Sequence, residues 1–262
     1  MNGLNETVVI WLAECRRILY SSRVIALLGL YSLFSVLVFL GAALLRSFVE
    51  QLTRSGMPLP TRDMPLAVLA VFYLSLFFLP VYVALMGFDQ VSGEVGPRSM
   101  RYLTVRARRT SVVLGKFLAQ TTVLLGLVLV LDLGLCLYTA VSTPGLGVGS
   151  LVLHLLKFWL ASTAFSLAFL ALTSLCSSLT TTPAVSLIAN LAVLMVSLLL
   201  WMTALMDADK PLRALRYLSP LRYSTRLLSP EPEQWGVSMA AYAVFTLVFL
   251  GGALQGLRTR DV

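Results

Sequence analysis

The stretch VIALLGLYSLFSVLVFLGAALL, residues 24–45, runs for 22 residues without a charged side chain. A helix rises about 1.5 Å per residue, so a stretch of this length crosses the roughly 30 Å hydrocarbon core of a bilayer. Backbone N–H and C=O groups find no water inside lipid and must pair within the helix. The stretch therefore predicts a membrane-spanning α-helix.

Five more apolar stretches of similar length follow along the chain. Together with the first, the expected spans are 24–45, 65–88, 117–141, 155–179, 184–206 and 237–257. Pro65 and Pro183 suit helix starts, because proline lacks an N–H that the first turn leaves unpaired, and Pro80 predicts a kink. We expect an all-α fold, in which residues 1–262 form one integral membrane domain with six transmembrane helices.

The composition supports a membrane protein. Hydrophobic residues make up 58% of the chain and charged residues only 12%, whereas about a quarter of the residues of a soluble domain are charged. The formal net charge is +8. Because the basic residues lie between apolar stretches, we attribute this charge to topology and anionic lipid, and we expect no nucleic-acid partner.

The distribution of basic residues predicts the orientation of the chain. Six spans put both termini on one side, and with that side inside, the inner segments hold eleven Lys and Arg residues against nine outside. The densest group lies between Arg98 and Lys116. The positive-inside rule therefore favours cytoplasmic termini.

Residues 4–22 precede the first span and have helical periodicity. One expected face carries Leu4, Val8, Trp11, Cys15, Ile18 and Leu19, and the other carries Glu6, Glu14, Arg17 and Ser21. This pattern predicts an amphipathic helix on the membrane surface. The alternative is a short cytosolic helix packed on a partner or on the chain itself. Between the last two spans, the leucines of residues 207–235 predict short helices that lie on or dip into the outer leaflet.

No pattern of residues indicates a catalytic or metal site. There is one histidine, His154, so a multi-histidine metal site is excluded. Neither a G-x-x-x-x-G-K-[ST] phosphate loop nor a G-x-S-x-G elbow occurs. Cys15, Cys136 and Cys176 lie far apart within expected helices. We therefore expect no enzyme activity and no cofactor bound by this chain.

Two polar residues lie inside the expected spans. Asp132 is either a group that lines a pathway or a structural group, which is paired with Lys157 or a hydroxyl of the next span, or protonated. Asn190, like the hydroxyl-rich stretch 174–182, favours hydrogen bonding between helices, and a role in the pathway is the alternative.

The connecting segment 89–116 carries the most specific pattern in the chain. Ser92, Gly93 and Glu94 form an expected turn at the end of a span, and residues 99–103 an expected short helix with Arg98 and Arg101. A basic cluster at residues 106–109 follows, and Leu114-Gly115-Lys116 opens the next span. A charged cytosolic helix tied to two spans can transmit force from a partner, whereas the alternative reading is an anchor for anionic lipid.

This segment resembles the permease subunits of ABC-2 type ABC transporters. Their I-S-G-E, G-T-L-R-x-L-L, R-P-V-x-R and L-x-G-K-x-L patterns are matched here, in order and spacing, by Ser92-Gly93-Glu94, Arg101-Tyr102-Leu103, Val105-Arg106 and Leu114-Gly115-Lys116-Phe117-Leu118. The chain departs from the patterns at Arg98-Ser99 and Arg106-Ala107. The N-terminal helix, the six spans, Leu218-Ser219-Pro220 and the ending Arg260-Asp261 extend the resemblance to the layout of the whole chain.

The resemblance implies a permease in the bacterial inner membrane that pairs with two copies of a separate ATPase and with a second permease, identical or related. ATP and Mg²⁺ would bind the ATPase. Segment 89–116 would be the coupling loop, with Ser92, Gly93, Glu94, Arg98, Arg101 and Arg106 as its site residues, and the turn 178–183 a smaller contact. Members of the family mostly export. The alternatives are a stand-alone secondary transporter or channel and, with less support, a membrane-embedded hydrolase.

Overall fold

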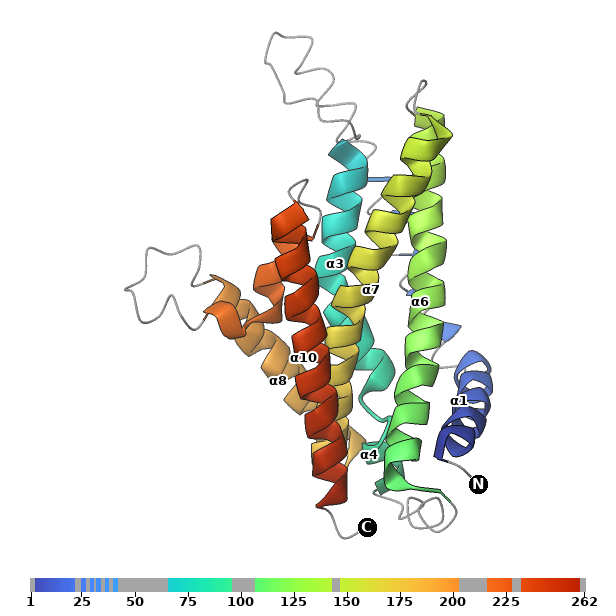
Figure 1. Cartoon of the computed structure of the whole chain (residues 1–262), viewed down its shortest axis with the longest axis vertical. Helices are drawn as coiled ribbons and strands as arrows, with labels where there is room; N and C mark the ends of the chain where they lie inside the picture. The colour runs from blue at the N-terminus through green and yellow to red at the C-terminus, as the bar shows by residue number, and fades with distance from the viewer. Residues whose placement is uncertain are drawn as a thin grey trace.

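A computed structural model describes residues 3–21, 66–95, 107–142, 147–202, 216–227 and 232–259, and ten positions between Ile25 and Gly41. These residues form helices and no strand, so the predicted all-α class is confirmed for them (Figure 1). The α-helices are α1 (Gly3–Leu19), α3 (Leu66–Gly87), α4 (Ser92–Val95), α6 (Arg109–Ser142), α7 (Val148–Leu179), α8 (Pro183–Met202) and α10 (Pro232–Arg258). Two 3-10 helices, η1 (Arg216–Leu218) and η2 (Pro220–Arg226), precede α10.

Five of the described helices are long and apolar enough to cross a membrane: α3, α6, α7, α8 and α10. They overlap the last five expected spans. Of the first expected span, 24–45, only the ten positions are described, and all ten are helical. The chain is therefore a multi-pass membrane protein, and the count of six spans stays a prediction. Helix α3 continues through Pro80.

Helices α6 and α7 extend well beyond the stretches that hydropathy selects. With 34 and 32 residues, they are about 51 and 48 Å long, against roughly 30 Å of hydrocarbon. Residues 109–116, which we expected in the connecting segment, form the first two turns of α6. The long helices therefore carry the bundle past the hydrocarbon layer.

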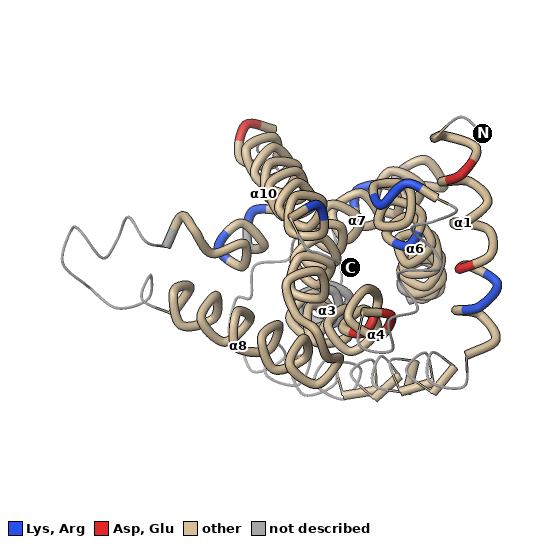
Figure 2. The backbone as a smooth tube through the Cα atoms, turned by 90° about the horizontal axis from the view of Figure 1, so that it is seen from below, with Lys and Arg blue, Asp and Glu red and all other residues tan. Residues whose placement is uncertain are grey.

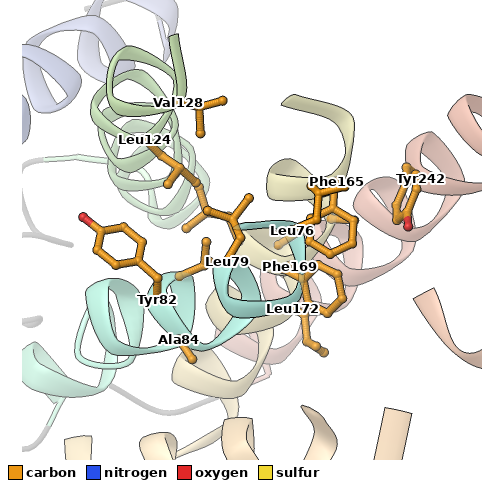
Figure 3. Close-up of a cluster of buried hydrophobic side chains, with 14 of the residues drawn as sticks. Leu76, Leu79, Tyr82, Ala84, Leu124, Val128, Phe165, Phe169, Leu172 and Tyr242 are labelled. Atoms are coloured by element: carbon orange, nitrogen blue, oxygen red, sulfur yellow. The ribbon is translucent and has the colours of Figure 1, made fainter. Parts of the chain in front are cut away.

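Helix α7 lies at the centre of the bundle and contacts α3, α6, α8 and α10. Phe165 and Phe169 on α7 pack with their ring centroids 4.8 Å apart, and Phe165 packs edge-on against Tyr242 of α10 (Figure 3). Leu79 of α3 and Leu124 of α6 lie in the same buried cluster. This core fixes the spans whose ends build the site described below.

Helix α8 diverges from the other spans (Figure 1), and residues 216–227 contact both α8 and α10. The buried Ser219 hydroxyl donates to the Ser197 carbonyl of α8 over 2.7 Å, and the Tyr242 hydroxyl of α10 donates to the Pro220 carbonyl over 2.8 Å. The expected short helices are confirmed for residues 216–227 as 3-10 turns. Their relation to the outer leaflet stays a prediction.

Helix α1 packs along the first turns of α6, and its orientation differs from the one expected. Glu6, Glu14 and Ser21 lie on the half-buried face beside Trp11 and Cys15. The exposed face carries apolar residues together with two arginines: Leu4, Val8, Val9, Leu12, Arg16, Arg17, Leu19 and Tyr20. The expected partition was wrong because the carboxylates bind partners within the chain, as shown next.

Both ends of the described chain lie at one end of the bundle, together with α1, α4 and the start of α6 (Figure 1). The turn between α7 and α8 also lies there, because a side chain at Gly256 near the end of α10 would meet Leu179. We call this region the terminal end.

Candidate functional site

Four charged side chains from three segments meet at the terminal end: Glu14 and Arg17 of α1, Glu94 of α4 and Lys116 of α6. Lys116 Nζ lies 2.7 Å from Glu94 Oε1 and 2.8 Å from Glu14 Oε1. Arg17 Nη1 lies 3.3 Å from Glu94 Oε1 and 3.5 Å from Glu14 Oε1. We call these four residues the charged junction. Figure 2 views the bundle from this end and shows charged residues on α1, α4 and α6.

The members of the charged junction differ in burial. The Lys116 side chain is 5% exposed, Glu94 13% and Glu14 18%, whereas Arg17 is 68% exposed. The Lys116 distances are those of strong charge-assisted hydrogen bonds. The Arg17 distances are longer, and its exposure to solvent weakens the attraction further. Lys116 is therefore the centre of the junction, and Arg17 is its most exposed and most weakly held member.

A glycine allows α1 to reach the junction. A Cβ atom at Gly115 would lie 2.7 Å from Ile10 Cγ2 and 3.1 Å from the Thr7 carbonyl oxygen, so any larger residue would push α1 away from α6. Two hydrogen bonds flank this close approach. The Arg108 backbone N–H donates to Glu6, and Trp11 Nε1 donates to Thr122 over 3.0 Å. The glycine of L-G-K thus has a packing role beside the lysine that follows it.

Hydroxyl groups near the end of α7 hold the connection between α3 and α4. Ser177 Oγ accepts the backbone N–H groups of Val91 and Ser92 over 3.0 and 3.1 Å. One turn earlier, the Ser174 hydroxyl donates to Gln90 Oε1 over 2.8 Å. All of these partners are buried. The predicted interhelical role of the stretch 174–182 is confirmed for these two serines.

The end of α10 joins the same assembly. Arg109 Nη1 donates to the carbonyl oxygens of Leu257 and Arg258, which the end of a helix leaves without intrahelical partners. The same segments also share a second hydrophobic cluster, which is formed by Val91, Val112, Val113 and Leu257. Hence α1, α4, α6, α7 and α10 are all connected through side chains at the terminal end.

The structure brings together some of the expected site residues. Ser92, Gly93 and Glu94 lie on α4 in the junction region, whereas Arg98, Arg101, Arg106 and the expected helix 99–103 lie outside the described residues. Sequence reasoning did not single out Lys116 or Glu14 as site residues. Lys116 could have been found from its place in L-G-K. No sequence signal pairs Glu14 with it, since the two residues are 102 positions apart.

The two intramembrane polar residues are buried in different surroundings. Asp132 is 3% exposed, and its Oδ2 has no hydrogen-bond partner among the described residues. Lys157, one of the alternative partners considered for Asp132, is an exposed residue. Asn190 is fully buried, and its Nδ2 donates to Thr173 of α7 over 2.8 Å. The interhelical bond expected of Asn190 is therefore present.

Comparison with known families identifies the chain. A family model described as ABC-2 family transporter protein matches residues 8–256. The chain belongs to this family. A search of curated proteins finds no match to it. In this ABC-2 permease, the S-G-E and L-G-K segments that carried the resemblance are the two that supply Glu94 and Lys116. The family is a membrane transport component and is not itself catalytic.

Proposed function

We propose that this permease forms the translocation pathway of an ATP-driven ABC exporter and is coupled to a separate ATPase subunit, which binds ATP and Mg²⁺. Two permease copies, identical or related, assemble with two ATPase copies in the bacterial inner membrane. Membership of the ABC-2 family supports an ABC transporter permease. Export, the copy numbers and the coupling are our extensions of that finding, and they follow the family pattern described above.

The observation that carries the coupling proposal is the ion pair between Glu94 and Lys116. Glu94 lies on α4, which follows α3 after a short turn, and Lys116 lies on the second turn of α6. An ATPase that pushes on the segment between them therefore acts on both helices at once. Ser177 of α7 holds the connection between α3 and α4. A displacement of α4 by the ATPase would therefore also reach α7 at the centre of the bundle.

The orientation that fits this coupling puts the terminal end in the cytoplasm. Segment 89–116 and the turn 178–183 then face the ATPase, and both termini lie on the same side. Helix α1 lies at the inner membrane surface, with its exposed apolar residues toward lipid. Its other face remains on α6, where Glu14 binds Lys116.

Copurification tests the proposed function. A tagged permease extracted in mild detergent should retain an ATPase with nucleotide-binding motifs, and reconstitution of the two should stimulate ATP hydrolysis. Transport by the purified permease alone, with no nucleotide-hydrolysing partner, would instead identify a secondary transporter or channel. A matched control is Arg16→Gln, which changes an exposed arginine outside the junction and should leave the copurified ATPase unchanged.

A further inference from the structure

Gly87 of α3 fixes the register between α6 and α7. A Cβ atom at Gly87 would lie 2.9 Å from both Gln120 Oε1 of α6 and Thr173 Cγ2 of α7, so these two residues lie at the same level of the bundle. The two helices pack side by side in opposite directions (Figure 1). Asp132 lies twelve residues after Gln120, and residue 161 lies twelve residues before Thr173, about 18 Å along either helix. Residue 161 therefore lies opposite Asp132.

The other ends of the same two helices give nearly the same register. Asp132 lies ten residues before Ser142, where α6 ends, and Phe158 lies ten residues after Val148, where α7 begins. Residues 158–161 of α7 are therefore the ones that lie opposite Asp132.

Three buried polar atoms at this level have no hydrogen-bond partner among the described residues: Asp132 Oδ2, Trp159 Nε1 and Thr163 Oγ1. Asp132 is only 3% exposed, and Thr163 lies within one turn of the residues opposite it. The two helices thus bring one acceptor and two donors to the same layer without pairing them. Buried polar groups in folded proteins are rarely left in this state, so the layer points to a ligand.

The chemistry of the layer suits a cation. Asp132 is the only Asp or Glu in the six expected spans, and a carboxylate at this depth requires a compensating charge. The indole ring of Trp159 attracts cations to its face more strongly than other aromatic rings do. Phe158, which is 2% exposed, adds apolar surface at the same level.

We propose that Asp132 and Trp159 bind the ammonium group of a hydrophobic amine, and that such amines are the substrate class of this permease. The carboxylate accepts from the ammonium, and the apolar body of the amine packs against the aromatic side chains. The Trp159 N–H and the Thr163 hydroxyl serve further polar groups of the ligand. The statement about substrate rests on the proposed function, whereas the binding site does not.

Lipid reaches α6 near this layer. Val130, Leu133 and Leu137 are 47–68% exposed, and each lies within five residues of Asp132. An amine with an apolar body dissolves in the bilayer, so it approaches Asp132 along the flank of α6 from the membrane.

Trp159 supplies a reporter at the site. The chain has four tryptophans, and Trp11→Phe, Trp201→Phe and Trp235→Phe leave Trp159 alone. This single-tryptophan permease, in nanodiscs of neutral phosphatidylcholine, is titrated with 2-phenylethylamine and with 2-phenylethanol. The two probes have the same shape, but only the amine carries a charge at neutral pH. We expect a saturable change in Trp159 emission, with a Kd at least tenfold lower for the amine than for the alcohol.

Variants of Asp132 assign the preference to its charge. In Asp132→Asn the Kd for the amine should rise at least tenfold, to about that for the alcohol. Asp132→Glu keeps the charge and should keep the preference. Cys136→Ala, one turn along α6, changes the packing without changing a charge, and it should also keep the preference.

Three results would overturn the proposal: no saturable change with the amine, equal affinity for the amine and the alcohol, or a preference that persists in Asp132→Asn. Equal affinity would assign the layer to neutral polar ligands. Because both probes are compared on the same folded protein, the test does not depend on how well a variant folds. The assay uses the permease alone, so its failure leaves the ATPase coupling untouched, and a failure of copurification leaves the binding site valid.

Discussion

Lys116 Nζ and Glu94 Oε1 lie 2.7 Å apart at the terminal end of the bundle, and they join two segments that the chain separates by 22 positions. The pair lies among mostly buried groups, where an ion pair is retained only if its geometry is good. Glu14 of α1 binds the same ammonium. The connecting segment after α3 is thereby fixed to α6 and to the N-terminal helix through one lysine.

Removal of the Lys116 charge should destabilise the permease. Lys116→Met removes the buried cation that lies closest to Glu14 and Glu94, and the exposed Arg17 compensates only weakly. The loss of one partner of a buried pair costs about 3–5 kcal/mol. Thermal unfolding in detergent should show a lower midpoint. Adding Glu94→Gln and Glu14→Gln to Lys116→Met should recover much of the loss, because no buried charge remains unpaired. No recovery in the triple variant would mean that Lys116 stabilises the protein by something other than charge.

The close approach of α1 to α6 should depend on Gly115. In Gly115→Ala, the new methyl group meets Ile10 and the Thr7 carbonyl, so α1 should separate from α6 and trypsin should cleave faster after Arg16 and Arg17. The control is Gly126→Ala on the same helix, where a Cβ would meet nothing within 4 Å. Equal cleavage of the two variants would show that the packing at Gly115 does not hold α1.

The hydroxyl of Ser177 should stabilise the turn before α4. Ser177→Ala leaves two buried backbone N–H groups without their acceptor, at about 1–3 kcal/mol each. The adjacent Ser178 donates only to Leu175 of its own helix among the described contacts, so Ser178→Ala should cost much less. Hydrogen exchange of residues 88–95 would measure the difference. If both alanine variants exchange alike, Ser177 does not hold this turn.

Asp132 provides a test of the pathway. Its buried oxygen lacks a partner among the described residues, so Asp132→Asn keeps the shape while it replaces the carboxyl group by an amide that cannot ionise. If Asp132 lines the pathway, the substitution should lower transport more than it lowers protein abundance. A vesicle transport assay beside an immunoblot gives the two quantities, and Cys136→Ala one turn away is the control. A parallel fall of transport and abundance would assign Asp132 a structural role only.

Hydropathy predicted the spans well because it measures the part of each helix that lipid surrounds. It placed the fourth span at 155–179, and α7 indeed ends at Leu179 but begins at Val148. The ends differ because the 25 residues of the expected span already cross the hydrocarbon, so the length criterion does not reveal how far the helix continues beyond it. For the same reason, the expected span at 117–141 did not include the first two turns of α6, which carry Lys116.

The orientation of α1 could not be predicted from the sequence. An amphipathic pattern identifies two faces, and the usual inference directs carboxylates outward, as we did for Glu6 and Glu14. In the structure both carboxylates find partners near the start of α6, at the N–H of Arg108 just before the helix and at Lys116. Pairings over about 100 positions cannot be derived from local periodicity. Glu94, in contrast, was predicted as a site residue from its short motif, although its partner was not.

The most direct test of the central claim is ATP hydrolysis by the reconstituted transporter with Glu94→Ala in the permease. We predict normal membrane insertion and normal recovery of the ATPase, together with a severalfold loss of the ATP hydrolysis that substrate stimulates. The reason is that α4 would no longer be tied to Lys116. Stimulated hydrolysis equal to that of the unsubstituted protein would contradict the claim that the charged junction transmits force between the ATPase and the spans.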